Sequence, residues 1–219
     1  DPQNLGLAPW GQKSDDPDQI GSPTNTDHKM SLRQLFRNHR FWLIGLSYFA
    51  IAYSLYGITT FMVDYAKNQL GLPLEKASLL ATIHGIGQVV GVLTVMPLSD
   101  YLGRKKTILI SNTVIATALA GILIVGNSWI LLCVCVGVLA IFYGVTFPIY
   151  GACAGDYFPK GSMGTVIGAW TPFYGAGAIL THWITGTLRD STTVYNHAFV
   201  ISVIMALFGI LLMSRVKSK

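Results

Sequence analysis

The stretch that decides the fold runs from Phe41 to Val63 and reads FWLIGLSYFAIAYSLYGITTFMV. It contains no Asp, Glu, Lys or Arg, and it is long enough for an α-helix to cross the ~30 Å hydrocarbon core of a bilayer. A run of this length without charge is typical of a membrane-spanning helix, because a charged side chain in hydrocarbon costs several kcal/mol. The stretch therefore predicts that the chain folds in lipid.

Further apolar stretches follow, and each is predicted to cross the bilayer as a helix. The six predicted spans are Phe41–Val63, Ala77–Pro97, Thr107–Val125, Ser128–Tyr150, Gly164–Thr185 and Asn196–Met213. The whole chain is 52% hydrophobic and 11% charged, whereas an ordinary soluble domain carries about 25% charged residues. The fold class that we expect is all-α: a polytopic membrane protein with a bundle of six transmembrane helices.

Three regions differ in composition. Residues 1–40 are polar and rich in Pro and Gly, which predicts a cytoplasmic linker. Within this linker, Met30–Arg40 spaces Leu and Phe along one helical face and Arg along another, which predicts a short interfacial helix. Residues 41–213 form the transmembrane bundle, and residues 214–219 form a cytoplasmic tail. A linker followed by six spans indicates the tail end of a longer protein.

The basic residues predict how the bundle is oriented. The net charge of +5 could indicate a nucleic-acid partner, but the positions of the charges favour a membrane explanation. If the spans alternate and Lys13, far from the first span, is left aside, eleven basic residues fall on one side: Lys29, Arg33, Arg37, Arg40, Arg104, Lys105, Lys106, Lys160, Arg215, Lys217 and Lys219. Three fall on the other side: Lys67, Lys76 and Arg189. Because cytoplasmic loops carry an excess of Lys and Arg, we expect both ends in the cytoplasm, a place in the plasma (cell inner) membrane, and no nucleic-acid partner.

No pattern in the sequence indicates catalysis. Cys133, Cys135 and Cys153 have spacings that fit neither a disulfide framework nor a zinc site, so we expect them to pack as small apolar residues. No HExxH motif and no nucleophile elbow is present, and Gly85 and Gly87 lie inside an apolar span, where a dinucleotide-binding loop does not occur. We therefore expect no enzyme activity, no metal and no cofactor.

Polar side chains within the spans predict a binding site near the bilayer midplane. His84 and Gln88 are four residues apart and share a helix face, as do Trp170 and Tyr174, and Tyr53 and Tyr56 lie close to one face of the first span. Polar groups in lipid usually face a bundle interior or a water-filled cavity. We expect His84 and Gln88 to bind substrate or couple protons. Tyr53, Tyr56, Trp170 and Tyr174 would line the cavity, although each of these residues could instead be a packing or structural hydrogen-bonding group.

The sharpest motif is Leu98–Lys106, which reads LSDYLGRKK. It resembles the cytoplasmic-loop signature of the major facilitator superfamily, with Met96 and Tyr101 departing from the usual pattern. Gly103 would let the chain reverse, and Asp100 is expected at a helix N-terminus, where the helix dipole stabilises an acid. The resemblance implies that Asp100, Gly103, Arg104 and Lys105 form a cytoplasmic gate that latches against the other half of the protein.

Other stretches extend this resemblance over essentially the whole chain. Asp156-Tyr-Phe-Pro159 with Gly164 is similar to an element that follows the tenth helix of many such transporters. The segment from Pro2 to Gly11, and Gly186 with Asp190, are similar to elements of oxalate/formate antiporter-like and monocarboxylate transporter-like members. The resemblance implies the central loop and last six helices of a twelve-helix fold, with the N-terminal six-helix half missing from this chain. It also implies a secondary transporter of a small solute, with a carboxylate as the suggested class. Proton coupling is a separate hypothesis, which rests on the position of His84 at depth in the second predicted span.

One feature of the sequence does not fit a carboxylate substrate. Carboxylate carriers of this type commonly hold the anion with an intramembrane Arg or Lys, and the predicted spans contain none at depth. His84 is the nearest candidate, so either the missing half supplies the charge or the substrate is not a simple anion. A membrane-embedded enzyme, and a non-transporting receptor or assembly subunit, stay open as alternatives.

Overall fold

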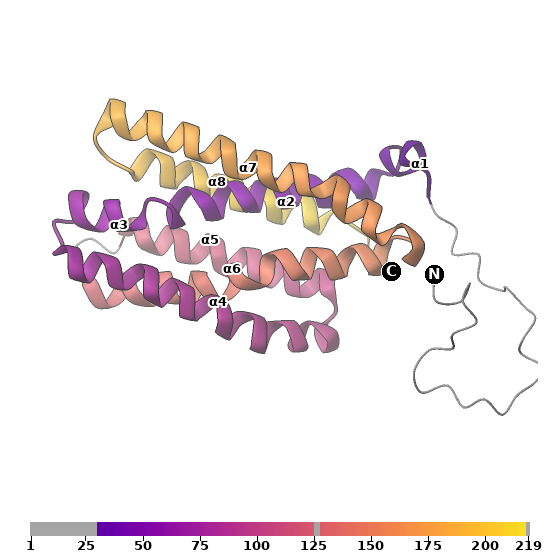
Figure 1. Cartoon of the computed structure of the whole chain (residues 1–219), viewed down its shortest axis with the longest axis horizontal. Helices are drawn as coiled ribbons and strands as arrows, with labels where there is room; N and C mark the ends of the chain where they lie inside the picture. The colour runs from indigo at the N-terminus through magenta and orange to yellow at the C-terminus, as the bar shows by residue number, and fades with distance from the viewer. Residues whose placement is uncertain (1–29, 125–127, 218–219) are drawn as a thin grey trace, which may run out of the picture.

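The computed structural model describes residues 30–124 and 128–217, and within these ranges the chain is helical and contains no strand (Figure 1). Its long helices run up and down along one axis. In chain order the elements are α1 (Leu32–Phe36), α2 (His39–Thr59), α3 (Met62–Asp64), the π-helix η3 (Tyr65–Gln69), α4 (Leu74–Leu102), α5 (Arg104–Ile124), α6 (Trp129–Tyr157), the 3₁₀ turn η4 (Lys160–Ser162), α7 (Met163–Thr192) and α8 (Asn196–Ser214). The prediction of an all-α helical bundle is confirmed.

Five helical segments in the described ranges are long and apolar enough to cross a membrane. They are His39–Gln69, Leu74–Leu102, Arg104–Ile124, Trp129–Tyr157 and Asn196–Ser214. Helix α7, which contains the predicted span Gly164–Thr185, is as long as these but does not meet the same hydropathy criterion. Its apolar residues alternate with Gly, Thr, Tyr and His, which is the composition of a helix that shows part of its surface to something other than lipid.

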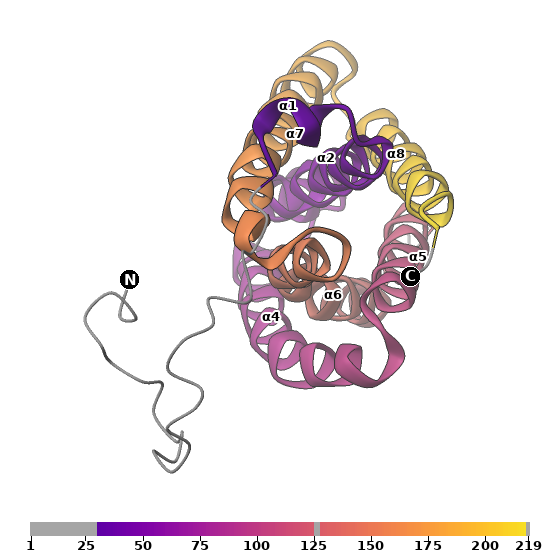
Figure 2. The same cartoon turned by 90° about the vertical axis from the view of Figure 1, so that its right-hand side faces the viewer.

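The long helices pack in a defined order. Helix α2 packs along both α7 and α8, α8 packs along α5, and α6 packs between α5 and α4. Figure 2, which looks along the bundle, shows this arrangement, with α4 and α7 at its two ends. Helix α2 is the most enclosed of the spans, because it has α7 on one flank and α8 on the other.

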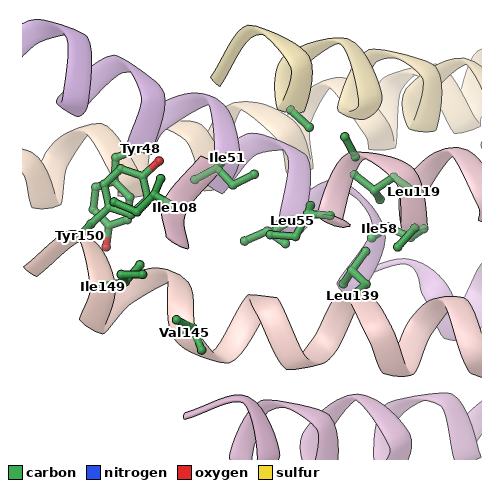
Figure 3. Close-up of a cluster of buried hydrophobic side chains, with 14 of the residues drawn as sticks. Tyr48, Ile51, Leu55, Ile58, Ile108, Leu119, Leu139, Val145, Ile149 and Tyr150 are labelled. Carbon is green, nitrogen blue, oxygen red and sulfur yellow. The ribbon is translucent and has the colours of Figure 1, made fainter. Parts of the chain in front are cut away.

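The apolar core lies where α2, α5 and α6 face one another. Ile51, Leu55 and Ile58 of α2 belong to one buried cluster with Ile108 and Leu119 of α5 and Leu139 of α6 (Figure 3). These positions on α2 recur every three or four residues, so they form one helical stripe. Burial of the stripe fixes the rotation of α2, and therefore fixes which of its remaining residues face α4 and α7.

Glycines set how closely α4 approaches α6. A Cβ built on Gly91 would lie 1.8 Å from the carbonyl oxygen of Ile141, and one on Gly87 would lie 2.6 Å from the Cβ of Ala140. From the opposite helix, a Cβ on Gly144 would lie 2.4 Å from the carbonyl oxygen of Gln88. Backbones this close require glycine, as expected of small residues at helix interfaces in membranes.

The helix ends differ from those that hydropathy predicts. Helix α4 continues through Pro97 to Leu102, and only Gly103, with φ 87°, separates it from α5. Helix α7 continues past the predicted span to Thr192, and Thr193 after it has φ 60°. Both helices therefore extend beyond the predicted spans, because hydropathy marks the hydrocarbon layer whereas a helix ends where a residue adopts non-helical backbone angles.

The segment before α2 begins with a short capped helix. The Ser31 side chain accepts a hydrogen bond from the Gln34 N–H at 3.3 Å, and the Gln34 side chain accepts one from the Ser31 N–H at 3.0 Å, which together form a capping box around α1. The backbone N–H of Met30 donates to Ser162 Oγ at 2.6 Å, so this segment contacts the turn before α7. The predicted linker over residues 1–29 lies outside the described residues, and the interfacial position of α1 stays a prediction.

Candidate functional site

Four helices bring polar and aromatic side chains together in the middle of the bundle. We call His84 and Gln88 of α4, Tyr143 of α6, Tyr56 of α2 and Tyr174 of α7 the central cluster. The ring centroids of His84 and Tyr143 are 5.0 Å apart, those of Tyr143 and Tyr56 are 5.9 Å apart, and those of Tyr56 and Tyr174 are 5.7 Å apart. The cluster therefore links α4 and α7, the two ends of the packing order. Of the predicted binding residues, His84, Gln88, Tyr56 and Tyr174 are brought together.

His84 carries an unused hydrogen-bonding atom in this cluster. Gln88 Nε2 lies 3.1 Å from His84 Nδ1, and with the amide nitrogen as donor the imidazole accepts at Nδ1 and carries its proton on Nε2. Among the described residues, Nε2 has no hydrogen-bond partner although it is buried. A buried donor without a partner is costly, so it is expected to be satisfied by a group absent from this structure.

The tyrosines supply hydroxyl groups but no charge. Tyr56, Tyr143 and Tyr174 are each half-buried, and the Tyr48 ring packs against that of Tyr174 at a tilt of 32°, with ring centroids 4.6 Å apart. No Asp, Glu, Lys or Arg belongs to the cluster as defined. Aromatic faces and hydroxyl groups in this arrangement suit a neutral or polyhydroxylated ligand, with the rings packing against carbon and the hydroxyls exchanging hydrogen bonds.

Two of the predicted cavity residues lie outside the cluster. Trp170 is fully buried between α7 and α2, its Nε1–H donates to the carbonyl oxygen of Phe41 at 3.1 Å, and its ring stacks on Phe41. Tyr53 is 2% exposed, and among the described residues its hydroxyl has no hydrogen-bond partner. Both residues pack in the interface between α2 and α7, behind the helix faces that carry Tyr56 and Tyr174.

Three residues of this region were not among the predicted binding residues: Tyr48, Tyr143 and His182. His182 Nε2 lies 2.8 Å from Thr60 Oγ1, and its ring centroid lies 5.9 Å from that of Tyr56. Tyr48 lies eight residues before Tyr56, so helical periodicity could have placed both on one face. Tyr174 and His182 of α7 are also eight residues apart, so the same periodicity could have indicated that His182 lies on the face of α7 that carries Tyr174.

We call the end of the bundle where α2 begins and α8 terminates the basic end. The gate motif forms a compact turn there. The Arg104 side chain donates hydrogen bonds to the Ser99 hydroxyl and to the Asp100 carboxylate across Gly103. Lys105 Nζ donates to the carbonyl oxygen of Ser214 at 3.3 Å, which ties the turn to α8. A pocket of about 470 Å³ lies beside it, lined in part by Asp156 and Tyr157.

The structure corrects the expected position of Asp100. Asp100 lies in the last turn of α4 and not at a helix N-terminus, so the helix dipole there does not favour a carboxylate. The Arg104 guanidinium provides the favourable charge instead. The side chain of Asp100 remains 59% exposed, which leaves it accessible to a further partner.

A second polar network closes the opposite end of the bundle. The Tyr195 hydroxyl donates to Asp64 Oδ2 at 2.5 Å, Arg189 lies 3.7 Å from the same carboxylate oxygen, and the Tyr195 N–H donates to Gln69 Oε1 at 2.7 Å. Burial, together with the Asp64 carboxylate, raises the pKa of Tyr195 to about 12. The network joins η3, the end of α7 and the start of α8.

In the part of the chain that the structure describes, no three His, Cys, Asp or Glu side chains gather into a group that could hold a metal ion. The expectation that the protein uses no metal or cofactor stays a prediction.

Residues 44–218 match the Major Facilitator Superfamily. The chain is 23% identical over 206 residues to the hexuronate transporter of Bacillus subtilis (strain 168), covering 90% of this chain and 49% of that protein. Among solved structures, the E. coli fucose:proton symporter FucP has a TM-score of 0.67 at 13% identity, covering 86% of this chain and 46% of that one. The POT family transporter PepTSo has a TM-score of 0.66 at 17% identity, covering 80% of this chain and 36% of that one.

The fold and these similarities define a multi-pass membrane chain of a transporter family. The chain belongs to the Major Facilitator Superfamily, because the match covers most of its length. It spans about half the length of the relatives it matches. The likeness to FucP and PepTSo, at this low identity, concerns the fold alone.

Proposed function

We propose that this chain is the C-terminal half of a secondary active transporter that moves a small solute by alternating access. The observation that carries the proposal is the central cluster, in which four helices bring an unpartnered imidazole donor and three tyrosines together. Secondary transporters bind substrate near the bilayer midplane, between two structural repeats. The missing N-terminal half would complete the site from the side of α4 and α7.

The solute that we propose is a carboxylate that also carries hydroxyl groups. The tyrosine hydroxyls and His84 Nε2–H suit the hydroxyl groups of such a molecule, and no fixed positive charge of the cluster binds its carboxylate. The N-terminal half would then supply the countercharge. The similarity to a hexuronate transporter supports this class, since a hexuronate is a sugar with a carboxylate.

Within this mechanism, His84 and Gln88 would bind substrate and take part in proton coupling. Tyr56 and Tyr174 would line the cavity, and Tyr53 and Trp170 would hold the faces of α2 and α7 from behind. Asp100, Gly103, Arg104 and Lys105 would form the gate at the basic end, which we propose faces the cytoplasm of a cell whose plasma (inner) membrane holds the protein. The exposed carboxylate of Asp100 would meet the other half when that side is closed.

Flux through proteoliposomes tests the proposal. The complete protein, reconstituted with an imposed pH gradient, should take up radiolabelled sugar acids in a saturable way, and His84→Ala should reduce that uptake at least tenfold. His197→Ala, at an exposed histidine of α8, is the matched control and should leave uptake within about twofold of wild type. Saturable binding of the solute without flux would instead indicate a receptor, and chemical conversion of the solute would indicate an enzyme.

A further inference from the structure

A basic pocket lies at the basic end of the bundle, apart from the central cluster and the gate motif. It has a volume of about 610 Å³ and lies between the start of α2 and the segment that follows α8. Its lining residues are Asn38, His39, Arg40, Leu43, Arg215 and Lys217. Two arginines and a lysine give it three fixed positive charges, and none of these lining residues is acidic. Like charges held together repel one another, so an anion in the pocket would lower the electrostatic energy.

Contacts on both sides hold the charged residues of the pocket in place. Val216 is buried, and its backbone N–H donates to the carbonyl oxygen of Met213 at 3.2 Å, which anchors the segment that carries Arg215 and Lys217. On the α2 side, the Arg40 guanidinium carbon lies 5.9 Å from the ring centroid of Tyr157, within the range of a cation–π contact. The cations are therefore positioned by the fold.

One of the two helix termini at the pocket favours an anion, and cations offset the dipole of the other. The N-terminus of α2, where the Asn38 side chain accepts from the Arg40 N–H at 3.0 Å, presents the positive end of the helix dipole. The C-terminus of α8 presents the negative end. There, Arg215 lies at the cap and Lys105 Nζ donates to the Ser214 carbonyl oxygen at 3.3 Å, so that two cations offset the α8 dipole.

Exposed apolar side chains near the start of α2 match the acyl part of a lipid. Leu43 is a half-buried lining residue, and Leu32, Phe36 and Trp42 are exposed on α1 and the first turn of α2. The Trp42 Nε1–H donates to the Phe36 carbonyl oxygen at 2.8 Å, so the indole has its polar edge satisfied. The side chain is 40% exposed and its ring also contacts Phe36, Phe41 and Phe173. Tryptophans of this kind are enriched at the level of lipid headgroups.

We propose that this pocket binds the phosphate headgroup of an anionic phospholipid from the adjacent leaflet. Basic pockets between helix ends on the cytoplasmic side suit such headgroups, because the cations pair with the phosphate while the acyl chains stay in the bilayer. This inference goes beyond solute transport and does not depend on it. A bound lipid would tie the beginning of α2 to the end of α8.

Native mass spectrometry of the full chain tests the proposal. The protein is released from detergent micelles in the presence of equal amounts of phosphatidylglycerol and phosphatidylcholine, and the bound lipids are counted. Wild type should retain phosphatidylglycerol preferentially. The double variant Arg215→Gln/Lys217→Gln should weaken that binding by roughly thirtyfold, since each basic residue contributes about 1 kcal/mol near an anionic surface. The control Lys106→Gln/Lys160→Gln removes the same charge from the same end but outside the pocket, and should change binding by less than about twofold.

Three results would overturn the proposal. Equal retention of the two lipids by wild type would show that the headgroup charge is not recognised. An equal loss in both double variants would show a diffuse surface charge effect. Displacement of the lipid by millimolar inorganic phosphate would assign the pocket to a soluble anion.

A measurement without variants guards against misfolding. The thermal unfolding midpoint of the wild-type chain in detergent should rise on addition of phosphatidylglycerol, because a ligand of the folded state stabilises it, and should not rise with phosphatidylcholine. An equal response to both lipids would contradict specific binding even if the pocket variants could not be purified.

Discussion

At the scale of single residues, His84 is the most informative side chain of the site. Its Nδ1 is occupied by Gln88, and its Nε2 is buried without a partner among the described residues. The sequence predicted the pairing of His84 with Gln88 from their spacing on one helix turn. It could not predict the unpartnered Nε2, because that depends on how α6 brings Tyr143 against the ring.

His84→Gln tests proton coupling directly. Glutamine keeps a hydrogen-bonding side chain but cannot take up a proton at physiological pH, so the variant should lose the increase of uptake that an imposed proton gradient produces. Exchange of labelled for unlabelled solute, which needs no net proton movement, should fall less than about threefold. A variant whose uptake still follows the proton gradient as in wild type would remove His84 from the coupling mechanism.

Tyr195 allows a prediction about pH and stability at the opposite end of the bundle. Its hydroxyl donates to Asp64, and Tyr195→Phe should lower the free energy of unfolding by about 1 kcal/mol at pH 7. The pKa of Tyr195 is raised to about 12 in the folded state, from an ordinary value of 10.0. The stabilisation should therefore be complete at pH values below the ordinary pKa of tyrosine, and it should be lost as the pH rises through the pKa of Tyr195 in the folded state.

The measurement is denaturant-induced unfolding in detergent, followed by circular dichroism across this pH range. Tyr101→Phe is the control, because Tyr101 is 88% exposed at the basic end. A difference between wild type and Tyr195→Phe that persists unchanged at the highest pH would show that the hydroxyl proton does not carry the stabilisation.

At the scale of elements, the crossing of α4 and α6 sets the position of the central cluster. His84 and Gln88 lie on α4 beside Gly87 and Gly91, which let α4 approach the α6 backbone. A wider separation of the two helices would move His84 away from Tyr143. The same residues that make the contact close therefore determine the geometry of the site.

Gly91→Ala should destabilise the bundle. The added Cβ would lie 1.8 Å from the Ile141 carbonyl oxygen, so the helices must separate, at a cost of about 1–3 kcal/mol. Gly85→Ala, on the same helix, is the control: its added Cβ meets nothing within 4 Å, and the higher helix propensity of alanine should leave the protein as stable or slightly more stable. Unfolding midpoints in detergent compare the two, and equal midpoints would contradict the proposed close contact.

At the scale of the whole molecule, the up-and-down arrangement places the described basic residues of α1, the gate motif and the segment after α8 at one end. The Asp64 network lies at the other end. From the positive-inside rule we propose that the basic end faces the cytoplasm. The chain completes one bundle of a family fold, and its α4 and α7 are the helices left at the ends of the packing order.

Labelling from either side of the membrane tests this topology. In a background in which Cys133, Cys135 and Cys153 are replaced by Ser, a cysteine introduced as Lys217→Cys should react with an impermeant maleimide only from the cytoplasmic side. Asp190→Cys should react only from the outside. If both positions reacted from the same side, α8 would not cross the membrane between them, and the proposed orientation would be contradicted.

The sequence by itself determined that the chain is helical and membrane-embedded, because charge-free runs of bilayer length have one stable solution in hydrocarbon. It also predicted that His84 and Gln88 share a helix face, since a spacing of four residues defines a helix face whatever the surroundings. The gate motif was predicted from its resemblance to a family signature. It did not determine the ends of α4 and α7, which follow backbone angles at Gly103 and Thr193 and not hydropathy.

Only the tertiary structure decided which polar side chains meet. It placed Trp170 and Tyr53 in the packing between α2 and α7, and it added Tyr143 and His182 to the neighbourhood of Tyr56. It also brought Arg40 together with Arg215 and Lys217, which are far apart in the chain. The physical reason is that helix rotation and helix spacing depend on long-range burial and glycine contacts, and these contacts are settled only when all the helices pack together.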